Sequence, residues 1–365
     1  MSLIAFSVSG VIVMVISGFL TFAFGGYGSP FLQHTDPDYS AAYVVLETDA
    51  GDGLKGYGIT FTLGKGTEVD WSRERGGAPG NSSHSERGVG PVGEAGRKVL
   101  CFPEEQMLMH GYPAYTTSCA WLGYSDDTLK QVGFLTWFCR FKVKVGADLQ
   151  DDMRRCRLIR DMIGPEKTLM MDANQRWDVP EAVEWMSKLA EFKPLWIEEP
   201  TSPDDILGHA AISKALLPLG IGVATGEQCH NRVIFKQLLQ ANALQFLQID
   251  SCRLGSVNEN LSVLLMAKKF GIPVCPHAGG VGLCELVQHL IIFDYISVSA
   301  SLKNRMCEYV DHLHEHFKYP VVIKQASYMP PKDAGYSTEM KEDSVRKHQY
   351  PDGDVWKKQL AAQEN

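Results

Sequence analysis

The chain has 365 residues, 45% of them hydrophobic, with 35 Lys and Arg against 43 Asp and Glu. This length can bury a substantial core, while the net charge of −8 and the absence of a basic run interleaved with aromatic residues argue against a nucleic-acid partner. Nine cysteines occur without a CxxC pair or a zinc-finger spacing, which indicates free buried thiols in a reducing compartment.

An uncharged apolar segment opens the chain. Residues 3–24, LIAFSVSGVIVMVISGFLTFAF, are just numerous enough to cross a bilayer as a helix. No Lys or Arg precedes them, so the positive region of a signal peptide is absent. Three interpretations stay open: a membrane anchor, a targeting segment, or an atypical start without a working role.

Two stretches of opposite character follow. Residues 41–66 predict a β-hairpin, because the β-rich runs AAYVVLETD and LKGYGITFTLG flank the turn sequence AGDG. Residues 70–98 lack apolar periodicity and are rich in Gly, Ser, Pro and charge. This second stretch cannot bury enough surface to offset its ordering entropy, so it is predicted to be disordered or a linker.

From Tyr115 onward, strand-like runs alternate with amphipathic helical patterns, which is typical of βαβ units around a parallel sheet. The eight strand-like runs are YTTSCAW, FKVKV, TLMMD, PLWIE, IGVAT, ALQFLQI, IPVCP and ISVSA. The helical patterns include residues 149–163, 179–189 and 258–270. Eight strands, and no glycine-rich dinucleotide turn, favour a closed (β/α)8 TIM-like barrel. Residues 123–141 are too few for a full first helix, which is expected to be short or malformed.

Lys142 and Lys144 are two residues apart in the run FKVKV, so their ammonium groups project from the same face of a strand. Two like charges side by side are unfavourable on an ordinary sheet face. They are useful beside an anion or a metal-bound carboxylate, and where one lysine must lose its proton near neutral pH. Taken alone, the pair fits a solvated strand face better; the later strands change that interpretation.

Polar residues follow the ends of the later strands at intervals of 23 to 31 residues, about one βα unit each. They are Asp172, Glu198, Glu227, Asp250, His277 and Glu308. Because the carboxyl ends of barrel strands share one rim, these side chains are predicted to meet there. Asp172, Glu198 and Glu227 would repel one another without a cation, and their hard oxygens suit Mg²⁺. Each alone could be a helix cap or a surface acid, but three in register argue against that. Strand alternation allows only one of Glu198 and Glu199 to face the metal.

Asp250 and His277 lie on consecutive strands. A carboxylate that accepts from one ring nitrogen fixes the tautomer of a histidine and raises the basicity of the other nitrogen. His277 alone could equally be a satisfied core histidine. With the lysine pair on the opposite side, the dyad would place an acid/base group on each face of a metal-bound substrate.

The set KxK, DAN, EEP, GE, D and H on successive strands resembles the enolase superfamily, mandelate-racemase subgroup. The stretches HTDPDYSAAYVV and TTSCAWLGYSDDTLK, and almost everything from Arg140 onward, resemble its L-fuconate dehydratase branch. The resemblance implies a barrel with an N-terminal α+β capping domain, a mitochondrial location and Mg²⁺ held by Asp172, Glu198 and Glu227. It also implies dehydration of an acid sugar, L-fuconate, to a 2-keto-3-deoxy sugar acid.

The same resemblance implies roles for the other polar residues. Lys144 is the base that removes the α-proton, and Lys142 lies beside the substrate carboxylate. His277, oriented by Asp250, is the general acid that protonates the departing 3-hydroxyl group. Glu308 is hydrogen-bonded to a carboxylate oxygen, and Tyr39 is a substrate contact from the small domain.

The sequence also departs from the family pattern. The disordered-looking residues 70–98 stand where the family has a bundle of helices, and the loop before HTDPDY reads GGYGSPFLQ without the expected acid. The capping domain is therefore expected to be truncated. The predicted division is an apolar segment 1–30, a capping remnant 31–69, a linker 70–100, a barrel 101–310 and a C-terminal extension 311–365 that packs back on the cap.

Three functions stay open at this level. The first is a Mg²⁺-dependent dehydratase that acts on a small-molecule acid sugar. Whether such an enzyme is a monomer or a homo-oligomer stays open. The second is a catalytically inactive barrel that binds a partner or is tethered to a membrane through residues 3–24. The third is a racemase or epimerase of hydroxy acids, because the same two-base site serves both reactions.

Overall fold

The computed structural model describes residues 8–19, 39–48, 54–63, 103–117 and 138–363. The predictions for the linker 70–98, for the loop GGYGSPFLQ and for the first barrel helix lie outside these ranges. Seven cysteines fall within them, and all seven are free thiols.

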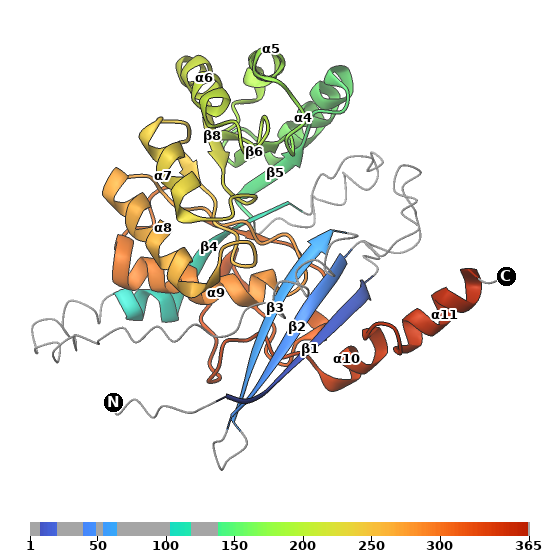
Figure 1. Cartoon of the computed structure of the whole chain (residues 1–365). Coiled ribbons are helices and arrows are strands. Elements are labelled where there is room, and N and C mark those ends of the chain that lie inside the picture. The colour runs from blue at the N-terminus through green and yellow to red at the C-terminus, as the bar shows by residue number, and fades with distance from the viewer. Residues whose placement is uncertain (1–7, 20–38, 49–53, 64–102, 118–137, 364–365) are drawn as a thin grey trace, which may run out of the picture.

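A closed barrel of parallel strands forms the centre of the molecule, which confirms the predicted TIM-like fold (Figure 1). Consecutive strands pair in parallel from β4 to β9, and β10 pairs in parallel with β4. The strands are β4 Tyr112–Thr116, β5 Arg140–Lys144, β6 Thr168–Asp172, β7 Trp196–Glu198, β8 Gly222–Thr225, β9 Phe246–Leu247 and β10 Cys307–Tyr309.

A short extended segment, residues 274–277, closes the gap between β9 and β10. Val274 bridges Leu247 in parallel, and the His277 amide donates to the Ile249 carbonyl at 3.0 Å. On its other side, the Glu308 amide donates to the Pro276 carbonyl at 3.1 Å. With the segment 274–277 counted, the barrel therefore has eight strand positions, the number that the sequence predicts.

The helices surround the barrel and each follows a strand (Figure 1). They are α4 Leu149–Ile163, α5 Val179–Leu189, α6 Ile206–Leu216, α7 Arg232–Gln240, α8 Ser256–Phe270 and α9 Leu283–Phe293. The first four begin at side-chain caps, Asp148, Asp178, Asp205 and Asn231, whose oxygens accept backbone amides of the first turn. These caps fix where each rim loop ends.

Two predicted strands differ from the structure. The predicted last strand ISVSA lies in a π-helical turn, Asp294–Ser299, that continues α9, and the last strand is instead β10. Ser299 donates its hydroxyl to the Asp294 carbonyl at 3.1 Å, and Ala300 ends the turn in a left-handed conformation. The first strand begins at Tyr112, three residues before the predicted YTTSCAW.

The apolar N-terminal segment forms a strand. β1 Val8–Phe19 pairs antiparallel with β2 Tyr39–Thr48, and β2 pairs antiparallel with β3 Lys55–Leu63, so the predicted hairpin becomes a three-stranded sheet. Val and Ile dominate β1 and favour strands. None of the three earlier interpretations of residues 3–24 anticipated this pairing. Among the described residues, no helix has the length and apolar character needed to span a membrane.

The C-terminal region contacts both the barrel and the three-stranded sheet. β12 Ser327–Met329 pairs antiparallel with β4, and with β11 Val322–Lys324. The Met340 amide donates to the Tyr43 hydroxyl of β2 at 3.0 Å, and the Thr338 hydroxyl donates to the Tyr57 carbonyl of β3 at 2.9 Å. The chain then continues into α10 Glu342–His348 and α11 Asp354–Gln363, which extends away from the barrel in Figure 1.

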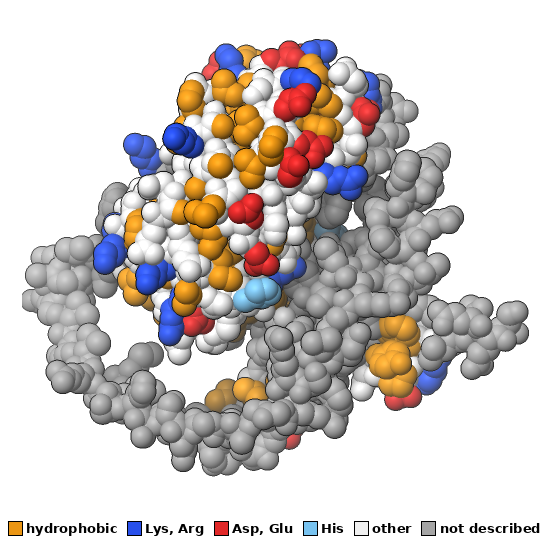
Figure 2. Space-filling model, turned by 45° about the horizontal axis from the view of Figure 1, so that its top comes forward, with side chains coloured by type: hydrophobic (Ala, Val, Ile, Leu, Met, Phe, Trp, Pro, Cys, Tyr) orange, Lys and Arg blue, Asp and Glu red, His pale blue; other side chains and the backbone are white. Residues whose placement is uncertain are grey.

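The outer face of the barrel helices carries a mixed surface. Figure 2 shows hydrophobic, basic and acidic side chains interspersed over these helices, without a large patch of one charge. Single exposed hydrophobic side chains, such as Leu207 and Leu265, are ordinary on a protein surface.

Candidate active site

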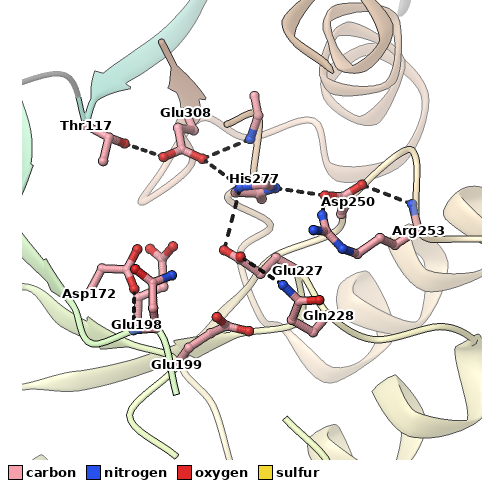
Figure 3. Close-up of polar contacts among 12 residues, drawn as sticks. Thr117, Asp172, Glu198, Glu199, Glu227, Gln228, Asp250, Arg253, His277 and Glu308 are labelled. Carbon is pink, nitrogen blue, oxygen red and sulfur yellow. Dashed lines mark hydrogen bonds and ion pairs between the residues drawn. The ribbon is translucent and has the colours of Figure 1, made fainter. Parts of the chain in front are cut away.

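The structure brings the predicted polar side chains of the barrel to one rim. Lys142 and Lys144 come from β5, Asp172 from the end of β6 and Glu198 from the end of β7. The others are Glu227 after β8, Asp250 after β9, His277 at the end of the segment 274–277, and Glu308 in β10. Figure 3 shows the carboxylates of Asp172, Glu198, Glu227 and Glu308 facing a common space, with His277 between Asp250 and Glu308.

Lys142 lies fully buried among three carboxylates. Its Nζ is 3.2 Å from Asp172 Oδ2 and 3.1 Å from Glu308 Oε1, and it donates to Glu198 Oε1. Burial alone would lower the pKa of Lys142, but Glu198 and Glu308 outweigh it and raise the pKa well above the ordinary value. Lys142 is therefore a fixed positive charge in the floor of the site.

Lys144 is the more accessible lysine, with 15% of its side chain exposed. Its Nζ donates to Asp172 Oδ2 at 2.6 Å, so Asp172 holds both lysines. Burial opposes the charge on Lys144, but the Asp172 carboxylate outweighs it and raises the pKa of Lys144. The Asn174 amide donates to the second Asp172 oxygen at 3.0 Å, which fixes this carboxylate at the end of β6.

Glu198 and Glu199 are both buried, although simple strand alternation predicts that only one faces the site. Glu198 contacts Lys142 and accepts a hydrogen bond from the Trp196 indole at 3.2 Å. Glu199 has a left-handed backbone with φ of 40°, which breaks the alternation, and its carboxylate accepts from the Gln175 amide at 3.0 Å. Burial and the nearby Glu227 and Asp172 raise the pKa of Glu199 to about 8.

His277 and Asp250 form the predicted dyad. His277 Nδ1 lies 2.8 Å from Asp250 Oδ2, and its Nε2 is 3.8 Å from Glu227 Oε2 and 3.6 Å from Glu308 Oε2. Burial would lower the pKa of His277, but Glu227, Glu308 and Asp250 outweigh it and raise the pKa to about 9. The imidazole is therefore protonated at neutral pH, as a general acid requires.

Glu308 connects the two halves of the rim. Its Oε1 accepts from Lys142 and from the Thr117 hydroxyl, while its Oε2 accepts the Ala278 amide at 2.9 Å. Burial would raise the pKa of Glu308, but Lys142 and His277 outweigh it and hold the pKa below its ordinary range. Glu308 stays ionised between the lysine side and the histidine side.

Sequence reasoning missed three contacts of these groups. Arg253 donates its guanidinium to Asp250 Oδ2, and the Cys252 and Arg253 amides donate to Asp250 Oδ1 at 2.8 and 3.0 Å. An Asp followed by such a turn is a common local pattern and could have suggested this. Trp196 lies two residues before Glu198 on the same strand face, so the period of two was a usable signal. Thr117 carried no signal.

Tyr39, the predicted substrate contact, begins β2, where its backbone pairs with Leu63 of β3. Its side chain lies outside the described part of the structure, so its role stays a prediction.

Gly226, which precedes Glu227, provides a test of how the rim is held. Its φ is +134°, and a Cβ there would lie 2.3 Å from the Gln248 carbonyl oxygen and 2.6 Å from Phe235 Cε1. We expect Gly226→Ala to lower the free energy of unfolding by about 1–3 kcal/mol from backbone strain alone, and further through the clash. Urea denaturation measures this loss.

Gly220→Ala is the matched control, because Gly220 has φ of +74° and nothing within 4 Å of an added Cβ. It should lose only the conformational part, about 1–2 kcal/mol. Equal losses in the two variants would show that the close packing around Gly226 does not matter.

The predicted magnesium ligands share the rim but do not form a ready coordination shell. Within the described ranges, no group of three or more His, Cys, Asp or Glu side chains is arranged to hold a metal ion. Lys142 lies between Asp172 and Glu198, whereas Glu227 faces His277. Ammonium groups contact two of the three carboxylates in this arrangement, so the convergence of Asp172, Glu198 and Glu227 on one cation stays a prediction.

The charge and chemistry of the rim nevertheless fit a divalent cation. Six carboxylates are buried there: Asp172, Glu198, Glu199, Glu227, Asp250 and Glu308. With every carboxylate ionised, they outnumber the cations Lys142, Lys144, Arg253 and protonated His277 by two, and the raised pKa of Glu199 lets a proton take up part of this excess when no cation is bound. Burial and Asp172 raise the pKa of Glu198 well above its ordinary value, a sign of this excess. Buried hard oxygens with an excess of negative charge suit Mg²⁺.

Comparison with known proteins decides the family. A family model described as Enolase C-terminal domain-like matches residues 127–344, more than half of the chain. The chain belongs to the enolase superfamily. This confirms the resemblance seen in the motifs of the barrel.

Two named relatives support the assignment. Human "Mitochondrial enolase superfamily member 1" is 65% identical over 427 aligned positions, covering 93% of this chain and 96% of that protein. The crystal structure of this human protein matches with a TM-score of 0.84 at 61% identity, covering 97% of this chain and 98% of that one. The L-galactonate dehydratase of Hypocrea jecorina is 55% identical over 253 residues, covering 68% of this chain and 56% of that protein.

A more distant structure shares the fold. The L-talarate/galactarate dehydratase from Salmonella typhimurium LT2, liganded with Mg and L-lyxarohydroxamate, matches with a TM-score of 0.67 at 21% identity. The match covers 93% of this chain and 92% of that one. At this identity the likeness concerns the fold alone.

Proposed function

We propose that this enolase-superfamily chain is a Mg²⁺-dependent dehydratase of acid sugars that removes water across C2 and C3. One observation carries the proposal: Lys144 and the His277–Asp250 dyad flank one rim cluster of buried carboxylates. The name of the Hypocrea jecorina relative, L-galactonate dehydratase, supports the same class.

Asp172, Glu198 and Glu227 would hold the cation in this proposal. Binding requires their side chains to turn from the ammonium groups and from His277 toward one point, which the excess of negative charge favours. When bound, the cation supplies positive charge that stabilises a substrate carboxylate and offsets the Asp172 charge that raises the pKa of Lys144.

Proton removal is assigned to Lys144. The hydrogen on C2, which is α to the carboxylate, moves as a proton to the neutral amine of Lys144, and its electron pair moves toward the carboxylate to give an enediolate. Lys142, buried and fixed beside the substrate carboxylate, balances part of the new charge. Glu308 accepts hydrogen bonds on both of its oxygens and would orient this end of the substrate.

Loss of water is assigned to His277. The electron pair returns to form the C2–C3 double bond, the C3–O bond breaks, and His277 donates its Nε2 proton so that the hydroxyl leaves as water. Asp250 keeps the ring oriented from the Nδ1 side. The resulting enol ketonises to a 2-keto-3-deoxy acid, so atoms and electrons balance.

The finer assignment is L-fuconate as substrate, with Tyr39 as a contact from the capping sheet and a mitochondrial location. The resemblance of HTDPDYSAAYVV and of the barrel motifs to the L-fuconate dehydratase branch supports the substrate. The printed name of the human relative supports the location.

A substrate panel tests the proposal. The full chain with Mg²⁺ should convert at least one of L-fuconate, L-galactonate, L-talarate and galactarate to a 2-keto acid, detected as its semicarbazone. EDTA should abolish the reaction, and added Mg²⁺ should restore it. Mg²⁺ should also raise the melting temperature, because a ligand that binds only the folded state stabilises it.

The contrary outcomes point to the other two functions. Exchange of the C2 hydrogen with solvent and inversion at C2, without dehydration, would indicate a racemase or epimerase. Stabilisation by Mg²⁺ without exchange or product on any of the four acids would indicate an inactive barrel. Activity that survives EDTA would overturn the metal dependence.

A further inference from the structure

Helix α4 contains a buried ion pair that the proposed reaction does not use. Asp152 and Arg155 have exposed fractions of 0% and 1%, and Arg155 Nη1 lies 3.3 Å from Asp152 Oδ1. Charged side chains are rarely buried this completely without a specific partner. A buried pair is also weak evidence for stability, because desolvation offsets much of its attraction. Its contacts therefore need a different explanation.

Both side chains hold the backbone that follows the lysine strand. Arg155 Nη1 donates to the Lys144 carbonyl oxygen at 2.8 Å. Asp152 Oδ2 accepts the Gly146 amide at 2.6 Å and the Trp185 indole at 3.2 Å. The pair thus hydrogen-bonds to the backbone on both sides of Val145, at the point where β5 ends at the rim.

Residues 144–146 have a backbone conformation that needs stabilising contacts from other parts of the chain. Gly146 has φ of +106°, a region that side chains rarely adopt. The Val145 amide donates to the Asp172 carbonyl at 2.8 Å, so the segment is tied to β6 on one side and to α4 on the other. The Cα of Lys144, and with it the reach of its amine, is set by these bonds.

We propose that Asp152 and Arg155 are positioning residues that hold the end of β5 so that the Lys144 amine meets the C2 hydrogen. The inference rests on the proposed function, because it concerns the same base. A misplacement of about 1 Å at a reacting group can cost about 100-fold in rate. The buried pair is thus placed where a small backbone shift has a large chemical effect.

Arg160 of the same helix supplies a matched control. Its guanidinium also binds backbone carbonyls, those of Phe192 at 2.7 Å, Lys167 at 2.8 Å and Gly164 at 3.1 Å. Gly164 and Lys167 lie between α4 and β6, and Phe192 lies between α5 and β7, so all three carbonyls are at the end of the barrel opposite the rim. The two arginines share their chemistry and differ in which end of the barrel they hold.

The experiment compares Arg155→Gln with Arg160→Gln in the full chain with Mg²⁺. The readouts are the free energy of unfolding, KM, and the rate of deuterium entry at C2 of the acid sugar that the wild type converts. Both variants should lose stability. Only Arg155→Gln should slow C2 exchange, by about 100-fold in kcat with KM nearly unchanged. Equal losses of kcat, or wild-type exchange in Arg155→Gln, would overturn the proposal.

Two further variants and a second readout keep the test decisive. If Arg155→Gln does not fold, Arg155→Lys and Asp152→Asn take its place, with the lysine variant retaining more rate because it keeps the charge. Amide hydrogen exchange at Gly146 needs no substrate: it should be faster in the Arg155 and Asp152 variants and unchanged in Arg160→Gln. If the wild type turns over no acid sugar, the proposed function fails. Unchanged Gly146 protection would overturn the positioning inference by itself.

Discussion

Lys144→Ala should abolish both deuterium entry at C2 and formation of the 2-keto acid, while leaving the fold intact. A general base contributes about 10²- to 10⁴-fold to a rate, and no dehydration can occur without the first proton transfer. The fold should survive because Lys144 is partly exposed and Lys142 still contacts Asp172 at 3.2 Å. Proton NMR in deuterated buffer measures the exchange, and the semicarbazone assay measures the product.

His277→Asn is the informative partner of this variant. It removes the acid that protonates the leaving hydroxyl but leaves Lys144 in place, so C2 exchange should persist while the 2-keto acid disappears. Loss of exchange in His277→Asn with exchange retained in Lys144→Ala would reverse the two roles. Full activity in Lys144→Ala would remove the assignment of the base.

Lys142→Met should unfold at much lower urea than the wild type. Methionine keeps much of the volume of lysine but leaves Asp172, Glu198 and Glu308 buried without the ammonium group that contacts all three. Removing one partner of a buried ion pair costs about 3–5 kcal/mol. Urea denaturation at pH 7 measures the loss. At this pH each of the three carboxylates must either stay charged without the ammonium group or take up a proton.

The pH dependence of this loss has a defined sign. Lys142 helps to hold the pKa of Asp172 and of Glu308 below ordinary values, so these groups stabilise the wild type above about pH 4, the pKa range of unfolded carboxyl groups. That contribution fades as the pH falls toward their folded pKa values. The gap between wild type and Lys142→Met should therefore narrow as the pH falls below about 4. Lys188→Met, which breaks an exposed pair with Glu184, should change little at any pH.

The repeating pattern of the barrel made its rim predictable. Each of Asp172, Glu198, Asp250 and His277 follows an apolar strand, and parallel strands end on one side, so sequence spacing alone placed them together. The same logic could not place their atoms. Whether Glu227 faces a cation or His277 depends on competing charges within a few ångströms, which spacing does not encode.

Local periodicity gave the wrong secondary structure where a strand and a helical turn share one sequence pattern. The run ISVSA alternates like a strand, yet it continues α9 as a π-helical turn, because five residues cannot separate the two periods. Glu199 escaped the alternation rule through its left-handed backbone. The residues of β1 were compatible with a bilayer segment because their composition is apolar and uncharged. Their pairing partner, β2, lies in a separate part of the chain, and composition cannot reveal such a partner.

Barrel closure joins residues that are far apart in the chain, with Ala114 of β4 opposite Cys307 of β10. During synthesis, β4 must wait with an unpaired edge until nearly the whole barrel has been translated, and such long-range parallel pairing is slow and exposed to aggregation. Glu308 sits on that last strand and contacts Lys142 from β5. The site should therefore be complete, and the chain able to catalyse a reaction, only after β10 has paired with β4 in the last step of folding.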